Sequence, residues 1–402
     1  MNHPECFAGT ATRDITPSLD RPVFLAGFTR NRTATGVEAP LLVRALALRL
    51  GEQSVVLIAC DIIGLDRSDV EEVRVMAAAR GVDPQALVVT CTHTHSGPDT
   101  IGLWGPDAMR SGVDPLYLAH VKRAIVEAAI EALAFGCPVM LRCATTRLPG
   151  FIKNFRDPQV VDDDLVAIQF AKPTGEVVAT VLNLACHPEV LDDRSRLLSP
   201  DYAGAACRAV EAAVGGTAMH ISGALGGMLS PDTADRTPAF VAHMGQAYAG
   251  TALDALAASE PIPVTQLSLQ RVIFDLPLQN PLFAQAIAAG IVRPRPTPGQ
   301  QMQTSCALID LGLVQILTIP GELLPRLGGL LKAAMHAPCR MIAGLADDEI
   351  GYILPDDDFT PPDDYLDPGA HYEESMSPGP QTGSIILRAA HSLLVQSESP
   401  VR

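Results

Sequence analysis

The sequence predicts a mixed α/β fold in which mixed β-sheets are flanked by helices. Apolar runs of strand length alternate along the chain with longer, helix-like patterns. Short turns join some neighbouring strands as hairpins, so the sheets are not purely parallel. Of the 402 residues, 48% are hydrophobic and 18% are charged, which is enough to bury a large core. This length permits one large domain or two ordinary ones, and the prediction is a single domain over residues 1–402.

The elements expected in the first part of the chain follow from turn and stop signals. A short strand over 9–17 ends at a proline, and strands over 42–50 and 54–60 flank a turn of hairpin length. A helix over 68–80 stops at a glycine and leads into a buried strand over 86–91.

The middle of the chain continues this alternation. A helix over 115–134 begins on a proline and ends before a glycine. Apolar runs predict three strands, at 139–145, 164–170 and 177–185. A helix over 202–213 and a strand over 218–222 then lead into the Gly-rich turn 223–231. This turn could be a phosphate cradle, but it lacks G-K-[ST] and G-x-G-x-x-G, and acidic residues follow it.

The last part of the chain adds a hairpin, further helices and long loops. The elements expected there are a helix over 239–258, a hairpin over 306–319, a helix from Glu322 to His336, a strand over 340–345 and a helix over 383–395. The segment 280–302 contains four prolines and a short apolar helix, and we expect it to be a lid or an insertion. Residues 355–380 are dense in Asp, Pro and Gly, which predicts a loop.

Charge and cysteine usage exclude several classes of protein. A net charge of -16 argues against a nucleic-acid partner and against an anionic membrane surface, because both attract Lys and Arg. The nine cysteines show no C-x-x-C spacing, which favours a reducing compartment. The N-terminus resembles no signal peptide, and no apolar run approaches the length of a membrane span. We therefore expect a cytoplasmic protein without an integral membrane segment.

Two histidine motifs stand at the ends of expected strands. The stretch T-H-T-H-S-G-P at 92–98 follows the strand over 86–91, and strand alternation would point His93 and His95 the same way. His187, in C-H-P, stands in the same position after the strand over 177–185. Such clustered imidazoles suit a metal or a reacting carbonyl. The alternative is that each imidazole only hydrogen-bonds a neighbouring strand.

Ordered sequence blocks connect these histidines to a known family. The blocks are G-T-A-T-R-D-I-T-P at Gly9, A-T-G-V-E-A-P-L at Ala34, R-A-L-A-L at Arg44, C-D-I-I-G-L at Cys60, T-H-T-H-S-G-P at Thr92, L-A-C-H-P at Leu184, S-P-D-Y-A-G at Ser199, G-A-L-G-G-M-L-S-P at Gly223, I-P-G-E-L at Ile319, D-E-I-G-Y-I at Asp348 and Y-E-E-S at Tyr372. In this order they resemble the catalytic domain of the neutral/alkaline non-lysosomal ceramidases, which are zinc-dependent amidases.

The resemblance implies a metal site and its ligands. It makes the zinc ligands His93, His187, Glu322 and Tyr352. Imidazole and carboxylate groups suit Zn²⁺, and three such ligands with a weak phenol leave room for a water. Without the family pattern, Tyr352 would be interpreted as an ordinary buried phenol.

The resemblance also implies residues that act on the substrate. It places His95 and Tyr372 beside the reacting carbonyl, where they would stabilise the oxyanion. Ser230 matches a serine once argued to be a nucleophile, although a structural turn serine is an equal alternative. Asp14 and Asp61 match family aspartates that would support the ligands or hold loops.

Three departures from the family pattern bear on the substrate. The Asn-Arg pair of the family is replaced by K-N-F-R at 153–156, so its substrate-binding arginine is displaced, and Arg156 is the candidate substitute. G-V-E-A-P-L replaces the usual G-V-H-D-P-L, and Gly226-Gly227 replaces a Gly-Asp pair. We also expect no C-terminal β-sandwich domain, because the chain ends soon after the Tyr372 block.

The function implied is hydrolysis of the N-acyl bond of ceramide or a related lipid-like compound, by attack of zinc-bound water on the amide. The alternatives are a hydrolase acting on a smaller soluble amide or peptide-like substrate, and a degenerate relative that binds such a ligand without turnover. A TIM-barrel hydrolase also begins with H-x-H, but it would need that motif on its first strand. Here two or more expected strands precede it.

Overall fold

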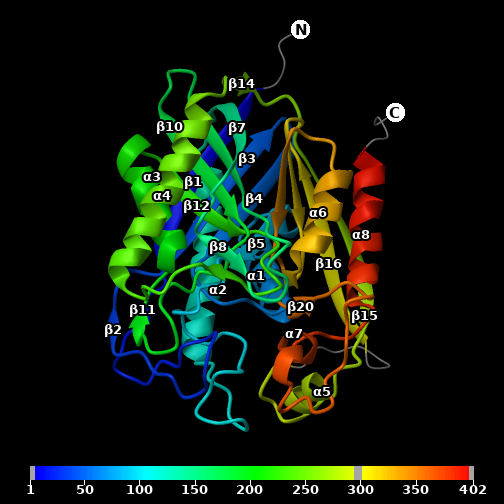
Figure 1. The fold of residues 1–402 in the computed structure, drawn as a ribbon. Coiled ribbons are helices and arrows are strands. Elements are labelled where there is room, and N and C mark those ends of the chain that lie inside the picture. The colour runs from blue at the N-terminus through cyan, green and yellow to red at the C-terminus, as the bar shows by residue number, and fades with distance from the viewer. Residues whose placement is uncertain (1–4, 294–300, 398–402) are drawn as a thin grey trace.

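The computed structural model describes residues 5–293 and 301–397. Its strands form three larger sheets, with helices packed on their outer sides (Figure 1). Across the first sheet the order is β5 (Leu87–Cys91), β4 (Gln53–Cys60), β3 (Leu42–Leu50), β1 (Cys6–Asp14) and β6 (Cys137–Pro138). Across the second it is β12 (Thr217–Ser222), β10 (Val177–Leu184), β9 (Asp164–Ala171), β7 (Met140–Arg147) and β14 (Ile262–Pro263).

The third sheet and three short strand pairs complete the β-structure. In order across the third sheet lie β15 (Ser268–Pro277), β16 (Gln301–Asp310), β17 (Val314–Thr318) and β19 (Cys339–Ala343). The short pairs are β2 (Gly36–Val37) with β11 (Leu197–Leu198), β8 (Ile152–Asn154) with β13 (Leu229–Pro231), and β18 (Glu322–Leu323) with β20 (Tyr352–Ile353). Each larger sheet mixes parallel and antiparallel pairs, which confirms the predicted fold class and differs from a TIM barrel.

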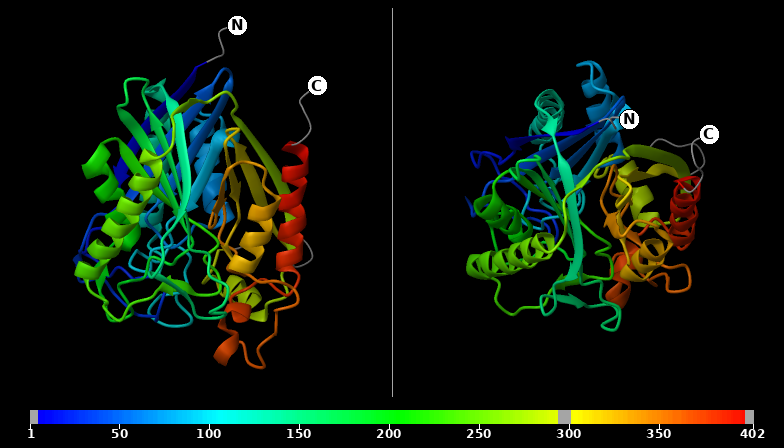
Figure 2. Two further views of the ribbon diagram at one scale, coloured as in Figure 1. Left: turned by 45° about the horizontal axis from the view of Figure 1, so that its top comes forward. Right: turned by 90° about the horizontal axis from the view of Figure 1, so that it is seen from above.

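Helices cover the outer faces of the sheets (Figure 2). They are α1 (Arg67–Ala78), α2 (Pro115–Ala134), α3 (Asp201–Val214), α4 (Pro238–Ala257), α5 (Pro281–Ala288), α6 (Pro325–Ala334), α7 (Tyr372–Ser375) and α8 (Thr382–Ser397). The first sheet packs against α1 and α2, the second against α3 and α4, and the third against α6 and α8. None of the helices in the described ranges is long and apolar enough to cross a membrane.

A shared apolar core lies between the inner faces of the three sheets. Successive residues of β3 alternate between two cores, because side chains of a strand alternate in direction. Val43 and Ala45 pack under the helices of the first sheet, whereas Leu46 and Leu48 join the core between the sheets. Both faces are therefore buried, which explains why this strand is almost continuously apolar.

Hydrogen bonds join the three sheets at the carboxyl ends of their parallel strands. Ser222 Oγ at the end of β12 donates to Thr92 O, just after β5, at 2.8 Å. The amide of Gly344, just after β19, donates to Ser222 O at 2.9 Å. The Cys91 amide donates to Leu345 O at 3.2 Å. Loops that leave these strand ends are thereby brought to one place.

Most expected elements are present, and the differences have physical reasons. The strand β15 was not expected because its side chains are mostly half-exposed and include Arg271 and Asp275. The helix expected from Glu322 begins only at Pro325, since residues 322–323 form β18 against β20. The predicted loop 355–380 contains the one-turn helix α7.

Two expectations about domain organisation stay predictions. The proposed lid or insertion at 280–302 contains α5, but its residues 294–300 lie outside the described ranges. The assignment of 1–402 to one domain likewise stays a prediction.

A buried ion pair generates a stability prediction. Asp61, expected to support the ligands or to hold a loop, pairs with Arg44 at 2.9 Å, and the two side chains are only 1% and 2% exposed. Asp61→Asn should lower the free energy of unfolding by about 3–5 kcal/mol, because it leaves the Arg44 charge buried without its partner. Chemical denaturation measures this loss. In the exposed Lys172–Glu176 pair, Glu176→Gln should leave the free energy of unfolding nearly unchanged, because water screens the interaction. Equal losses in the two variants would contradict the prediction.

Candidate metal centre and active site

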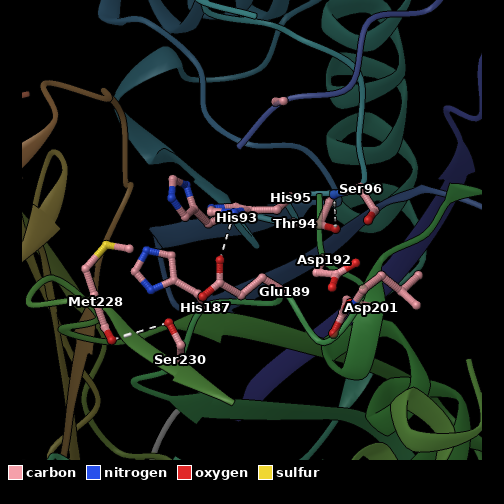
Figure 3. Close-up of polar contacts among 12 residues, drawn as sticks. His93, Thr94, His95, Ser96, His187, Glu189, Asp192, Asp201, Met228 and Ser230 are labelled. Carbon is pink, nitrogen blue, oxygen red and sulfur yellow. Dashed lines mark hydrogen bonds and ion pairs between the residues drawn. The ribbon is translucent and has the colours of Figure 1, made fainter. Parts of the chain in front are cut away.

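Three histidines meet at the joined strand ends (Figure 3). The ring centroids of His93, His95 and His187 lie 5.2 to 5.4 Å from one another. All three side chains are buried, and one nitrogen from each lies within 4.8 Å of the others. The structure therefore brings His187 to the T-H-T-H motif, which lies about ninety residues earlier in the sequence.

The local route to this cluster differs from the expected strand alternation. The strand β5 ends at Cys91, and His93 has a left-handed backbone with φ of 65°. His93 and His95 therefore lie after the end of the strand. The alternation of side chains along a strand does not set their directions, and that part of the prediction was wrong. The turn is fixed because the His93 amide donates to Ile62 O and the His95 amide to Pro188 O.

Glu322 places a carboxylate between two of the imidazoles. Its Oε2 lies 3.0 Å from His187 Nε2 and 3.6 Å from His93 Nε2. The parallel pairing of β18 with β20 sets Glu322 opposite Tyr352. The Tyr352 hydroxyl lies beside Glu322 and donates its proton to Met228 Sδ at 3.3 Å. The four residues expected to bind zinc are thus adjacent in space.

The hydrogen bonds of the imidazoles fit a cation at Nε2. His93 Nδ1 lies 2.6 Å from Ile63 O, and His187 Nδ1 lies 2.8 Å from Leu229 O. A neutral imidazole carries one N–H, which these carbonyls accept. On both rings Nε2 then faces the Glu322 carboxylate, so it must carry a second proton or bind a cation. Backbone carbonyls commonly orient metal-binding histidines in this way.

The pKa shifts of His187 and Glu322 also favour a positive charge between them. Burial alone lowers the pKa of His187, but the hydrogen bond to Glu322 and the charges of Glu189 and Glu322 outweigh it and raise the pKa to about 9. Burial would raise the pKa of Glu322, yet His93 and His187 hold it well below its usual range. A buried, ionised carboxylate between imidazoles is a suitable donor set for zinc.

His95 has a different partner, which the sequence analysis missed. Its Nδ1 lies 3.0 Å from Glu189 Oε2. Burial lowers the pKa of His95 to about 4, even though the Glu189 charge opposes it, so the ring is neutral near pH 7. Burial opposes ionisation of Glu189 as well, but His95 and His187 lower its pKa to about 2. The position of Glu189, two residues after His187 in H-P-E, was the available signal.

A glycine packs closely on the His95 ring. Gly27 has φ of 98°, and a Cβ there would lie 2.3 Å from His95 Cγ. Any side chain at this position would displace the imidazole. The backbone at Gly27 therefore helps to fix the orientation of His95.

Ser230 lies behind the site. Its hydroxyl is buried on β13, donates to Met228 O at 3.3 Å and lies near Glu189. It is not among the described residues that line the pocket. This location favours the structural interpretation of Ser230 over a nucleophile.

The remaining two expected residues are Tyr372, which belongs to α7, and Arg156, which contacts the same helix. Tyr372 lines the pocket, and its ring centroid is 6.1 Å from that of Tyr352. Arg156 forms ion pairs with Glu373 and Glu374 and is not among the described lining residues. The structure thus brings Tyr372 to the histidines and directs Arg156 to carboxylates of the protein.

An apolar pocket of about 360 Å³ opens onto the cluster. His93, His95, Glu322, Tyr352 and Tyr372 contribute polar groups to its lining. Most of its other lining side chains are apolar, among them Ile101, Leu103, Trp104, Phe283, Ile287 and Met302. Two of these come from α5 in the segment 280–302, and three come from the loop after the H-x-H turn. The pocket therefore combines polar groups in one place with a mainly apolar wall.

Comparison with known proteins identifies the fold. No family model matches the sequence, and no curated protein matches it. A neutral ceramidase from Pseudomonas aeruginosa matches in structure with a TM-score of 0.79 and 17% identity, over 98% of this chain and 75% of that chain. A ceramidase complexed with C2 matches with a TM-score of 0.80 and 16% identity, over 99% of this chain and 76% of that chain. The chain therefore has the neutral ceramidase fold.

The geometry predicts about one tightly held metal ion per chain. His93→Ala and His187→Ala should each lower its occupancy, because each removes an Nε2 that faces Glu322. Elemental analysis of purified protein measures the occupancy. His120→Ala, which changes an exposed histidine on α2, is the control and should leave it unchanged. Metal-free active protein, or full occupancy in both site variants, would contradict the prediction.

Proposed function

We propose that this chain is a zinc-dependent amidohydrolase that cleaves the N-acyl bond of ceramide or a related lipid-like compound. The observation that carries the proposal is the buried Glu322 carboxylate, held between His93 and His187 where the apolar pocket opens. The fold shared with neutral ceramidases supports it. Zinc, when bound there, would supply a Lewis acid and lower the pKa of a bound water toward about 7.

The proposed ligands are His93, His187, Glu322 and Tyr352. The two histidines and the carboxylate suit zinc directly, and the phenol lies beside the carboxylate. His95 is a competing ligand, because the three imidazoles are mutually close. Measuring metal in His95→Ala separates the two sets: retained metal favours a role on the substrate, and lost metal makes His95 a ligand.

The proposed roles on the substrate belong to Tyr372 and His95. The Tyr372 hydroxyl would donate a hydrogen bond to the substrate carbonyl oxygen as negative charge develops there. The His95 ring, which is neutral near pH 7 in the free protein, would do so after gaining a proton, and Glu189 at 3.0 Å and the developing negative charge would favour that protonation. Gly27 and Glu189 would hold the imidazole in this orientation.

The pocket supports an apolar acyl group on the substrate. Burying a hydrocarbon chain against Ile101, Trp104 and Phe283 gains free energy in proportion to the apolar area removed from water. The hydrolysed bond would then lie where the apolar wall meets the histidines. A smaller soluble amide would leave much of this wall uncovered. A cytoplasmic location stays a prediction.

The experiment that tests the function is a panel of fatty-acyl 4-nitroanilides of graded chain length, assayed with zinc-loaded protein. We expect turnover to rise with chain length until the pocket is filled, and a chelator to abolish it. Glu322→Gln is the matched inactive control, because it removes the charge with little change of volume. Turnover of short amides alone would favour the soluble-substrate alternative. Tight binding without any turnover would favour a non-catalytic relative, and Glu322→Gln activity within twofold of wild type would contradict the metal assignment.

Replacing Tyr352 or Tyr372 by phenylalanine should lower the activity for different reasons. Tyr352→Phe should lower zinc affinity, so added zinc should restore part of the activity. Tyr372→Phe should lower kcat by about 10² to 10³ with metal content and KM nearly unchanged, because an oxyanion donor acts mainly in the transition state. Zinc titration while following kcat compares them. Zinc rescue of Tyr372→Phe, or normal occupancy and turnover in Tyr352→Phe, would overturn these roles.

A further inference from the structure

The guanidinium group of Arg156 hydrogen-bonds Asp358, Glu373 and Glu374. It donates to Glu373 Oε2 at 2.6 Å and to both carboxylate oxygens of Glu374 at 2.8 and 3.2 Å. Its remaining contacts are with the side chain and the backbone carbonyl of Asp358, at 3.2 and 3.0 Å. An arginine has five N–H donors, so these five hydrogen bonds account for all of them. No donor is left for a substrate.

The backbone of Arg156 is fixed to the other side of the site. Its amide donates to Asn154 Oδ1 at 2.9 Å and to Gly227 O at 3.3 Å. Asn154 ends β8, which pairs with Leu229 of β13, and Leu229 O accepts from His187 Nδ1. Arg156 therefore extends from the strand pair that supports a candidate zinc ligand.

Arg156 binds two residues of α7, a helix that is too short to be stable by itself. The helix α7 is a single turn of four residues, Tyr372–Ser375, and so short a helix is unstable without tertiary contacts. Its far end is held because Tyr352 N donates to Met376 O at 3.0 Å and Asn280 Nδ2 to Ser375 O at 2.7 Å. Gly351, with φ of 87°, permits this approach, since a Cβ there would lie 2.0 Å from Met376 O.

The carboxylates bound by Arg156 directly follow Tyr372 in the sequence. The side chains of Glu373 and Glu374 are 4% and 1% exposed, whereas Tyr372 is 42% exposed and lines the pocket. Two adjacent buried carboxylates repel each other unless a cation lies between them. Without Arg156 the turn would move to expose these charges, and the Tyr372 phenol would move with it.

We propose that Arg156 is a positioning residue: it clamps α7 against the strand pair β8–β13 and so holds the Tyr372 phenol beside the candidate metal centre. The inference rests on the proposed role of Tyr372 in the reaction. It differs from the expectation that Arg156 substitutes for a substrate-binding arginine. A planar guanidinium can bridge two carboxylates and a carbonyl, which a lysine ammonium cannot match.

The test compares Arg156→Ala, Tyr372→Phe and the double variant on the fatty-acyl 4-nitroanilide that wild type hydrolyses fastest. We expect Arg156→Ala to lower kcat by about 10² at most, the loss of an oxyanion donor, with KM and zinc content within twofold of wild type. The double variant should be no slower than the slower single variant. Arg156→Lys keeps the charge and should show a smaller loss of kcat. This variant provides the comparison if Arg156→Ala does not fold. Arg326→Ala, which breaks an exposed pair with Asp357, is the control and should change nothing.

A second measurement does not depend on activity. Hydrogen exchange should accelerate at the amides of Met376 and Ser377, which donate to Tyr372 O and Glu374 O, in Arg156→Ala but not in Arg326→Ala. Unchanged exchange would overturn the clamp, whatever the kinetics show. A raised KM with multiplicative losses in the double variant would overturn it in favour of substrate binding. Normal kcat in Tyr372→Phe with accelerated exchange in Arg156→Ala would leave the clamp supported and reject the proposed role of Tyr372.

Discussion

The site depends on the hydrogen bonds that join three sheets at their strand ends. Ser222 is central, because its hydroxyl donates to Thr92 O and its carbonyl accepts from Gly344 N. Asn183 adds a further link, since its amide donates to carbonyls in both the second and the third sheet. Backbone groups that leave a strand must find partners when they are buried. Here they find them in the neighbouring sheets, and this places the three departing loops together.

The candidate ligands therefore come from all three sheets. His93 follows the first sheet, His187 follows the second, and Glu322 follows β17 of the third. No two adjacent elements could form this cluster alone. A metal bound there would favour the assembled state over an unfolded chain, in which the ligands are far apart. Binding of a metal would thus be coupled thermodynamically to packing of the shared core.

The pocket is built from less regular segments around this rigid centre. Its apolar wall comes from the loop that carries Trp104, from α5 and from the segment near Met376. These segments are held by side chains such as Asn280, which caps α5 and bonds the carbonyls of Ser375 and Ser377. Reactive groups on strand ends and specificity groups on loops are a common division in enzymes. It allows the pocket to vary while the histidines stay in place.

The sequence alone determined the fold class, the order of most elements and the identity of the histidine motifs. Hydrophobic periodicity and turn residues are local signals, so strands such as 42–50 and the helix 115–134 were predicted with matching bounds. Ordered motifs also singled out Glu322 and Tyr352 as candidates. Only the tertiary structure decided what each side chain contacts. Glu189 beside His95, and Arg156 bound to Glu373 and Glu374, depend on pairings between distant segments. Such pairings leave no local periodicity, because they are set by how the three sheets pack and not by neighbouring residues.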